Sequence, residues 1–156
     1  MNGNVIGGDP GTQGGVAVID KLGKVLFFKG FTPGMTLTQF RDICREAAAK
    51  AGPGARAWVE QVESRPGQGH VGPFSFGHAL GWLEMGLAAH DVEVRHVRPM
   101  MWQATLGCLS SGNKNVTKRR AIDLFGVQVG EKAITHAVAD ALLLAEYGRG
   151  RAGVPG

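Results

Sequence analysis

Three short apolar runs joined by tight turns place the strongest constraint on how this 156-residue chain folds. The runs cover residues 4–9, 14–20 and 24–30, and the turn sequences DPGTQ and DKLG connect them. Runs of this length that are bounded by Gly, Pro and Asp are typical of β-strands. Links this short join antiparallel neighbours, because parallel strands need a longer crossover. We therefore expect the chain to begin with a three-stranded antiparallel unit.

Helical and strand patterns alternate after this unit. Apolar spacing and Gly/Pro breakers separate the segments from one another. The expected elements are a helix at 36–51, a strand at 55–62, a helix from about 74 to 90, a strand at 92–97, and helices from 99, at 115–125 and at 135–147. Three antiparallel strands followed by parallel βα units predict a mixed five-stranded α/β sheet with helices on both faces.

Composition predicts one soluble domain at 1–148 and a flexible, Gly-rich tail at 149–156. Hydrophobic residues make up 44% and charged residues 19%, and we see no apolar run of the roughly 18 residues that a membrane span needs. Without a signal-peptide pattern, and with Cys44 and Cys108 expected as free thiols, we place the protein in the cytoplasm of a bacterial or virus-infected bacterial cell. A net charge of +4 favours a polyanionic partner.

The last expected helix is apolar nearly all the way round, yet it carries His136 and Asp140. Residues four apart lie on one helical face, so the imidazole and the carboxylate point the same way. A carboxylate on a mostly buried helix is costly unless it has a partner. That partner is a metal ion or, alternatively, His136 itself or one of the arginines of the chain.

Two further acids end apolar strands, Asp9 after VIGG and Glu60 after AWV. The first and fourth strands of such a sheet are commonly neighbours, so both side chains are expected in one cleft with Asp140. Clustered carboxylates repel one another unless divalent cations neutralise them. We expect two Mg²⁺ or Mn²⁺ ions here, the arrangement that hydrolyses phosphodiesters.

Five segments resemble one known family in order and approximate spacing: GGDPGTQGGVAVID, AWVEQV, VRPMMWQATLG, KNVTKRRA and HAVADALLLAEYG. This family, the RuvC-like Holliday junction resolvases, has the ribonuclease H-like fold, and the likeness runs from about residue 3 to residue 147. The resemblance implies a homodimeric crossover junction endodeoxyribonuclease for DNA recombination and repair. Such an enzyme nicks two opposed strands of a four-way junction symmetrically and leaves 5′-phosphates.

The resemblance also assigns catalytic and metal-binding residues. The acids of the family correspond to Asp9, Glu60 and Asp140. A fourth ligand of the family, Asp or His, usually lies three residues before the final Asp, where this chain has Ala137. We carry that role to His136, which lies four residues before it.

Basic and aromatic residues are candidates for DNA contacts. Lys114, Lys118, Arg119 and Arg120 crowd the start of a helix, where cations oppose the helix dipole, and phosphate contact would reverse that cost. The alternative is a solvated basic face. Phe74 and Phe76 are candidates for a wedge between bases, with core packing as the alternative. The position where the family often has an aromatic residue is Glu63 here.

The helix expected to end near residue 90 contains Gly77, Gly81 and Gly86, and mid-helix Gly implies close approach of another backbone or tight packing on the sheet. The resemblance places the dimer interface on this helix, and the candidates for that face are His78, Trp82 and Met85.

Two other functions stay open: a nucleotide-binding module of the actin-like ATPase class, and a junction-binding protein that does not cleave. No motif identifies a branch-migration helicase as a partner.

Overall fold

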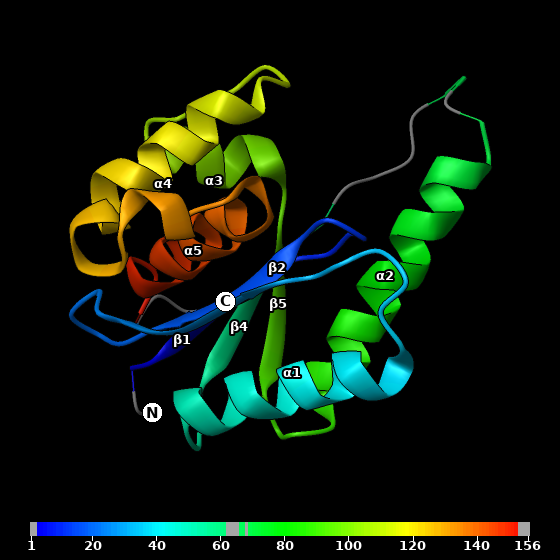
Figure 1. Cartoon of the computed structure of the whole chain (residues 1–156), viewed down its shortest axis with the longest axis horizontal. Coiled ribbons are helices and arrows are strands. Elements are labelled where there is room, and N and C mark those ends of the chain that lie inside the picture. The colour runs from blue at the N-terminus through cyan, green and yellow to red at the C-terminus, as the bar shows by residue number, and fades with distance from the viewer. Residues whose placement is uncertain (1–2, 62–65, 68, 153–156) are drawn as a thin grey trace.

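The computed structural model describes residues 3–61, 66–67 and 69–152. Its strands are β1 (Val5–Asp9), β2 (Gly15–Ile19), β3 (Val25–Gly30), β4 (Arg56–Glu60) and β5 (Glu93–Val97). Its helices are α1 (Leu37–Ala51), α2 (Val71–Ala88), α3 (Pro99–Thr105), α4 (Lys114–Val129), α5 (His136–Arg149) and the short 3-10 helix η1 (Glu131–Ala133) (Figure 1).

The strands form one five-stranded sheet in the order β3-β2-β1-β4-β5. β1, β2 and β3 pair antiparallel, whereas β4 pairs parallel with both β1 and β5. This arrangement confirms the predicted mixed α/β sheet. β1 therefore lies at the centre, with an antiparallel neighbour on one side and a parallel neighbour on the other.

Helices cover both faces of the sheet, as predicted (Figure 1). α1 and part of α2 pack on one face, over a core that includes Ile6, Val18 and Leu83. α3, α4 and α5 cover the other face, where Trp102, Phe125 and Leu143 are buried. α5 lies against the sheet on one side and against α3 and α4 on the other, which explains why its sequence is apolar nearly all the way round.

Two glycines allow α5 to approach the sheet at backbone distance. A Cβ atom added to Gly7 in β1 would collide with the carbonyl oxygen of Ala141, and one added to Gly15 in β2 would collide with that of Ala137. Small residues on both sides of the contact therefore determine how closely α5 approaches β1 and β2.

The start of α2 and the end of α4 differ from the expected boundaries. α2 begins at Val71, ahead of Pro73, because a proline in the first helical turn costs no hydrogen bond. α4 continues past Phe125 through a buried glycine and ends only at Gly130, whose φ of +86° favours glycine.

The structure bears on three further expectations from the sequence. No helix in the described part of the chain combines the length and the apolar character that crossing a bilayer requires. Cys44 and Cys108 are free and buried. α5 runs to Arg149, and residues 153–156 of the predicted tail lie outside the described residues.

Candidate active site

Two acids lie next to each other where β1 and β4 end. The two strands run parallel, and Gly8 is paired with Val59. The next residues along the two strands are Asp9 and Glu60, which therefore share the carboxyl-terminal edge of the sheet. In open α/β sheets this edge is where ligands bind.

Helix α5 brings the third acid, Asp140, to the same edge. Its Ala137 lies directly over Gly15, the residue of β2 that pairs with Asp9. Asp140 follows within the same turn, and its negative charge raises the pKa of both Asp9 and Glu60. The structure therefore brings together all three predicted acids, and the contact of the α5 backbone with β1 and β2 is what allows it.

Burial disfavours ionisation of all three carboxyl groups, and the charge of a neighbouring acid adds to this effect at Asp9 and Glu60. Burial is the largest cause for each, and it raises the pKa of Asp9 well above its ordinary value and that of Glu60 to about 7. The pKa of Asp140 is raised as well, again mainly by burial. A divalent cation bound between such carboxylates would offset both the burial and the repulsion.

Two positive or potentially positive groups face the acids. Lys114, at the start of α4, lowers the pKa of Asp9, Glu60 and Asp140. His136, exposed at the start of α5, lowers the pKa of Asp140 alone. Lys114 was expected at the DNA phosphates, and the structure places it close enough to interact with all three acids. Its position at a helix start, where a cation opposes the helix dipole, was the available signal.

Two hydrogen-bond donors complete the surroundings of the acids. The indole Nε1 of Trp102 donates to Oε2 of Glu60 over 2.9 Å. The Thr117 hydroxyl lies within hydrogen-bonding reach of Asp140 and of the Lys114 carbonyl oxygen, which is 3.2 Å away. The sequence did not identify either residue as part of the site, because α3 and α4 reach the acids only through tertiary packing.

The described acids and His136 do not form a ready-made coordination shell in this arrangement. Among the residues that the structure describes, no group of three or more His, Cys, Asp and Glu side chains surrounds a point where a metal ion would sit.

Two other basic residues expected at the DNA, Arg119 and Arg120, differ in their exposure and in their bonding partners. Arg119 is exposed and pairs with Asp123 at 3.4 Å on the same helix. Arg120 is half-buried, and its Nε donates to the Leu106 carbonyl oxygen over 2.9 Å. Arg120 therefore bonds α4 to the end of α3. Lys118 and Arg119 lie on the same helix, and Arg119 pairs within it.

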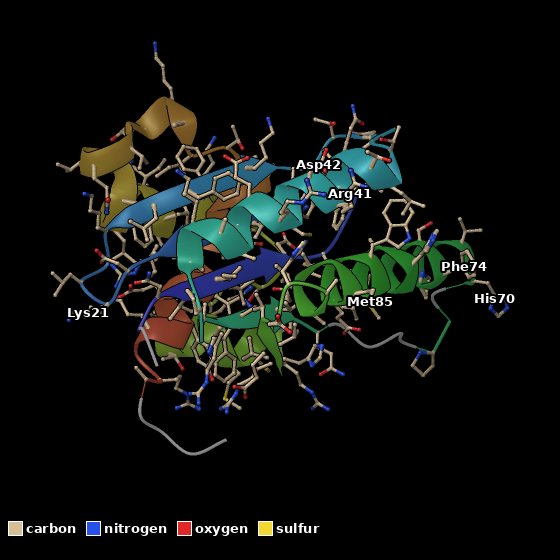
Figure 2. The ribbon with its side chains drawn as sticks, turned by 90° about the horizontal axis from the view of Figure 1, so that it is seen from below. Lys21, Arg41, Asp42, His70, Phe74 and Met85 are labelled. Carbon is tan, nitrogen blue, oxygen red and sulfur yellow. The ribbon has the colours of Figure 1, made fainter. Side chains whose placement is uncertain are left out.

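The first half of α2 extends beyond the sheet (Figures 1 and 2). Phe74 is 76% exposed and Met85 is 68% exposed, whereas Phe76 is half-buried. Apart from the adjoining backbone of α2 itself, no described atom lies within 4 Å of a Cβ atom added at Gly77 or Gly81. Tight packing on the sheet therefore does not explain these two glycines.

Two further expectations concern Gly86, the third glycine of α2, and the position of Glu63. Gly86 does pack closely within the chain, against Cys44 of α1. Glu63 lies outside the described residues.

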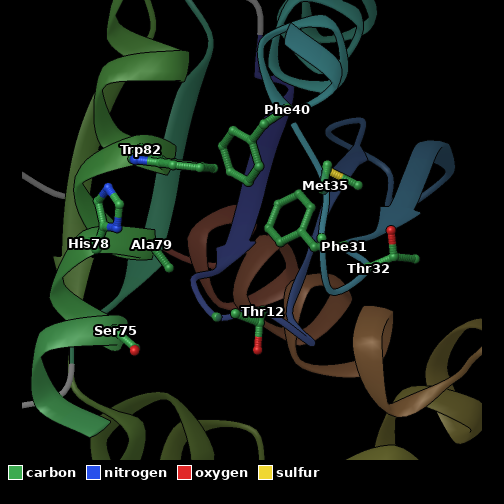
Figure 3. Close-up of a pocket in the computed structure, with 11 residues that line it drawn as sticks. Thr12, Phe31, Thr32, Met35, Phe40, Ser75, His78, Ala79 and Trp82 are labelled. Atoms are coloured by element: carbon green, nitrogen blue, oxygen red, sulfur yellow. The ribbon is translucent and has the colours of Figure 1, made fainter. Parts of the chain in front are cut away.

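A pocket of about 240 Å³ separates α2 from the β3–α1 loop and the β1–β2 turn (Figure 3). His78 and Trp82 line it from α2, and Phe31 and Phe40 line it from the opposite side. The Trp82 ring packs edge-on against Phe40, with 5.8 Å between ring centroids. Of the three residues predicted for a dimer face, His78 and Trp82 thus turn toward this pocket.

Comparison with solved structures gives the fold. The chain resembles a structure of T. thermophilus RuvC in complex with a Holliday junction substrate, with a TM-score of 0.71 and 19% identity. The match covers 96% of this chain and 94% of that one. A second structure of Thermus thermophilus RuvC gives a TM-score of 0.70 and 20% identity, and covers 96% and 95% of the two chains.

Comparisons by sequence add no relative. No protein-family model matches the chain, and a search of curated proteins finds no match. The resemblance seen in the sequence motifs is thus confirmed at the level of the fold.

Proposed function

We propose that this protein is a metal-dependent endonuclease that resolves four-way DNA junctions by paired, symmetric nicks. The observation that carries the proposal is the set of half-buried acids Asp9, Glu60 and Asp140 at the edge of a RuvC-like sheet, where burial raises the pKa of all three and the charge of Asp140 raises the pKa of the other two. A structural neighbour was solved with a Holliday junction substrate. We predict that the protein acts on DNA in the cytoplasm of a bacterial or virus-infected bacterial cell.

The donor set fits Mg²⁺ or Mn²⁺. Carboxylate oxygens from Asp9, Glu60 and Asp140 are the ligands that these hard cations prefer, and an imidazole such as that of His136 suits Mn²⁺ somewhat better than Mg²⁺. Two bound ions would supply an activated water and stabilisation of the leaving oxygen, giving a 5′-phosphate. Lys114 lies where it neutralises part of the negative charge of the site before a cation or a phosphate arrives.

Phosphate contacts are proposed for the basic start of α4. Lys114, Lys118 and Arg119 lie within its first two turns, and contacts of this kind fix the position of DNA without reading its sequence. Phe74 stays our candidate for a wedge between bases because it is largely exposed on the protruding helix. Phe76 and Arg120 are weaker candidates, since both are half-buried.

A homodimer through α2 is proposed as the assembly. One exposed face of this helix carries Phe74 and Met85 and the open Gly77 and Gly81. A second copy covering this face would bury its apolar surface. Pairing of two identical chains would also hold two active sites at a fixed separation, which symmetric nicking requires.

The test is incubation of the purified protein with a labelled, partly mobile four-way junction beside a linear duplex of matched sequence. Each substrate is tested with Mg²⁺, with Mn²⁺ and with EDTA, and the products of both strands are resolved. We expect paired, metal-dependent nicks confined to the junction, and none from Asp9→Asn. Tight junction binding without nicks from the wild type would indicate a non-cleaving binding protein. Neither binding nor cutting would favour the nucleotide-binding alternative.

A further inference from the structure

We propose that Trp102 is a positioning residue that holds Glu60 in the orientation in which it binds the divalent cation. The inference rests on the proposed function, because it concerns the cation of that site. It assigns a role to a tryptophan that provides none of the oxygen or imidazole ligands.

The contact between the two side chains is specific. The indole N–H is the one polar group of a tryptophan side chain, and it can only donate. In Trp102 it donates to Oε2 of Glu60 over 2.9 Å. A hydrogen bond to an ionised acceptor is stronger than one between neutral groups. The same bond favours the ionised carboxylate: it lowers the pKa of Glu60, whereas burial and the charge of Asp140 raise it.

Packing fixes the indole before it meets the carboxylate. Trp102 is 0% exposed within the core that also contains Val97 and Phe125. A buried ring in a close-packed core has little freedom to change rotamer. The N–H therefore points in one direction, and Glu60 has to place Oε2 there to satisfy it.

The same stretch of chain also fixes the backbone of Glu60. Glu60 pairs with Val97 at the end of β5, and the Gln61 amide donates to the Val97 carbonyl oxygen over 2.9 Å. α3 starts two residues after Val97 and delivers Trp102 from its first turn. One continuous segment, β5 to α3, thus holds both the main chain and the carboxylate of Glu60.

This arrangement counteracts repulsion between the acids. The charge of Asp140 and the burial of the site both disfavour ionised Glu60. The indole bond keeps it at the sheet edge beside Asp9 and Asp140. Hydrogen-bonding partners of metal ligands typically contribute 10–100-fold to metal affinity or activity.

The simpler alternative is that Trp102 only fills the core and that Glu60 satisfies its N–H. In that case removing the N–H would change stability but leave cation affinity unchanged. The two explanations are separated by a variant that keeps the fused rings and removes only the donor.

The experiment replaces Trp102 by β-(3-benzothienyl)alanine, in which sulfur takes the place of the indole N–H. Mn²⁺ binding to the DNA-free protein is measured from the electron paramagnetic resonance signal of free Mn²⁺. Trp102→Phe is a second variant, and Trp58→Phe is the matched control, because Trp58 packs on Tyr147 and, among the described residues, makes no hydrogen bond to an acid. Thermal unfolding in EDTA checks that each variant folds.

We expect the benzothienyl variant to bind Mn²⁺ 10–100-fold more weakly than the wild type. Trp58→Phe should bind it normally. Junction binding in EDTA should not change in either protein. The cutting lost by the benzothienyl variant at limiting Mn²⁺ should return in part at high Mn²⁺, which a purely structural defect would not allow.

Unchanged Mn²⁺ affinity in a folded benzothienyl variant would overturn the inference. If Trp102→Phe fails to fold, the isosteric variant decides. If the wild type binds no Mn²⁺, or if Glu60→Gln binds it as tightly as the wild type, then both this inference and the proposed metal site are wrong. If the wild type binds Mn²⁺ through Glu60 but cuts no junction, the proposed reaction fails, and the effect of Trp102 on Mn²⁺ affinity still tests the inference.

Discussion

Replacing Glu60 by Gln is expected to stabilise the metal-free protein at pH 8 and to leave its stability at pH 4 nearly unchanged. The reason is the pKa of Glu60, which burial and the charge of Asp140 raise from 4.5 to about 7. Below pH 4.5 the carboxyl group is protonated in both the folded and the unfolded chain. Between pH 4.5 and 7 the unfolded chain releases its proton while the folded one keeps it, so stability falls as pH rises.

The size of the effect follows from that difference in pKa. Each pKa unit corresponds to about 1.4 kcal/mol, so ionised Glu60 costs the folded protein about 3 kcal/mol above pH 7. Glutamine keeps the shape of the side chain and an oxygen that accepts from Trp102, but it carries no charge. For a domain of this size, Glu60→Gln should raise the Tm at pH 8 by about 6–12 °C.

Urea unfolding in EDTA at pH 4 and pH 8 measures this difference, with Glu46→Gln on the exposed face of α1 as the control. Saturating Mn²⁺ should reverse the order at pH 8, because it stabilises the protein that binds it. If Glu60→Gln gains less than about 0.5 kcal/mol between pH 4 and pH 8, the size of an ordinary surface substitution, the assignment of a buried, repelled carboxylate is refuted.

Three further predictions test the packing, the electrostatics and the DNA contacts. Gly7→Ala should destabilise the protein by about 3 kcal/mol or more, because the added methyl group collides with the α5 backbone. Gly72→Ala, in open space on α2, should change stability by no more than about 1 kcal/mol; equal thermal unfolding of the two variants would contradict the close approach of α5. Lys114→Met should shift the pH profile of cutting to higher pH, because Lys114 lowers the pKa of three acids that must ionise to bind a cation; an unchanged profile would restrict Lys114 to phosphate contact. Replacing Lys118 and Arg119 together by Gln should reduce the slope of log K against log salt for junction binding by about 1.8, and an unchanged slope would return both residues to a solvated face. Adding Arg120→Gln should mainly lower stability, since Arg120 holds the Leu106 carbonyl oxygen.

Local patterns in the sequence were sufficient to place Asp9 and Glu60 at the ends of strands. Each acid follows an apolar run bounded by turn residues, and such runs depend on near neighbours in the chain. The adjacency of β1 and β4 follows from the rules for connecting strands. His136 and Asp140 fall on one helical face through their spacing alone. These features survive in the structure because tertiary packing does not alter them.

The sequence could not show which residues surround the acids. Trp102, Lys114 and Thr117 reach the site on α3 and α4, and their positions depend on how these helices dock on α5 and the sheet. The sequence also could not show that two residues predicted for the dimer face, His78 and Trp82, line a pocket, while His78 and Met85 are exposed. Helix docking depends on side-chain packing between distant segments, which periodicity does not encode.

The amino-acid sequence by itself determined the order of strands and helices and the identity of the acids, because both follow from the local alternation of polar and apolar residues. Only the tertiary structure decided how close the acids lie. That distance depends on the approach of the α5 backbone to Gly7 and Gly15, a contact between segments more than 100 residues apart. The pKa of about 7 for Glu60 is a consequence of that approach, since burial and the charge of Asp140 both act over a few ångströms.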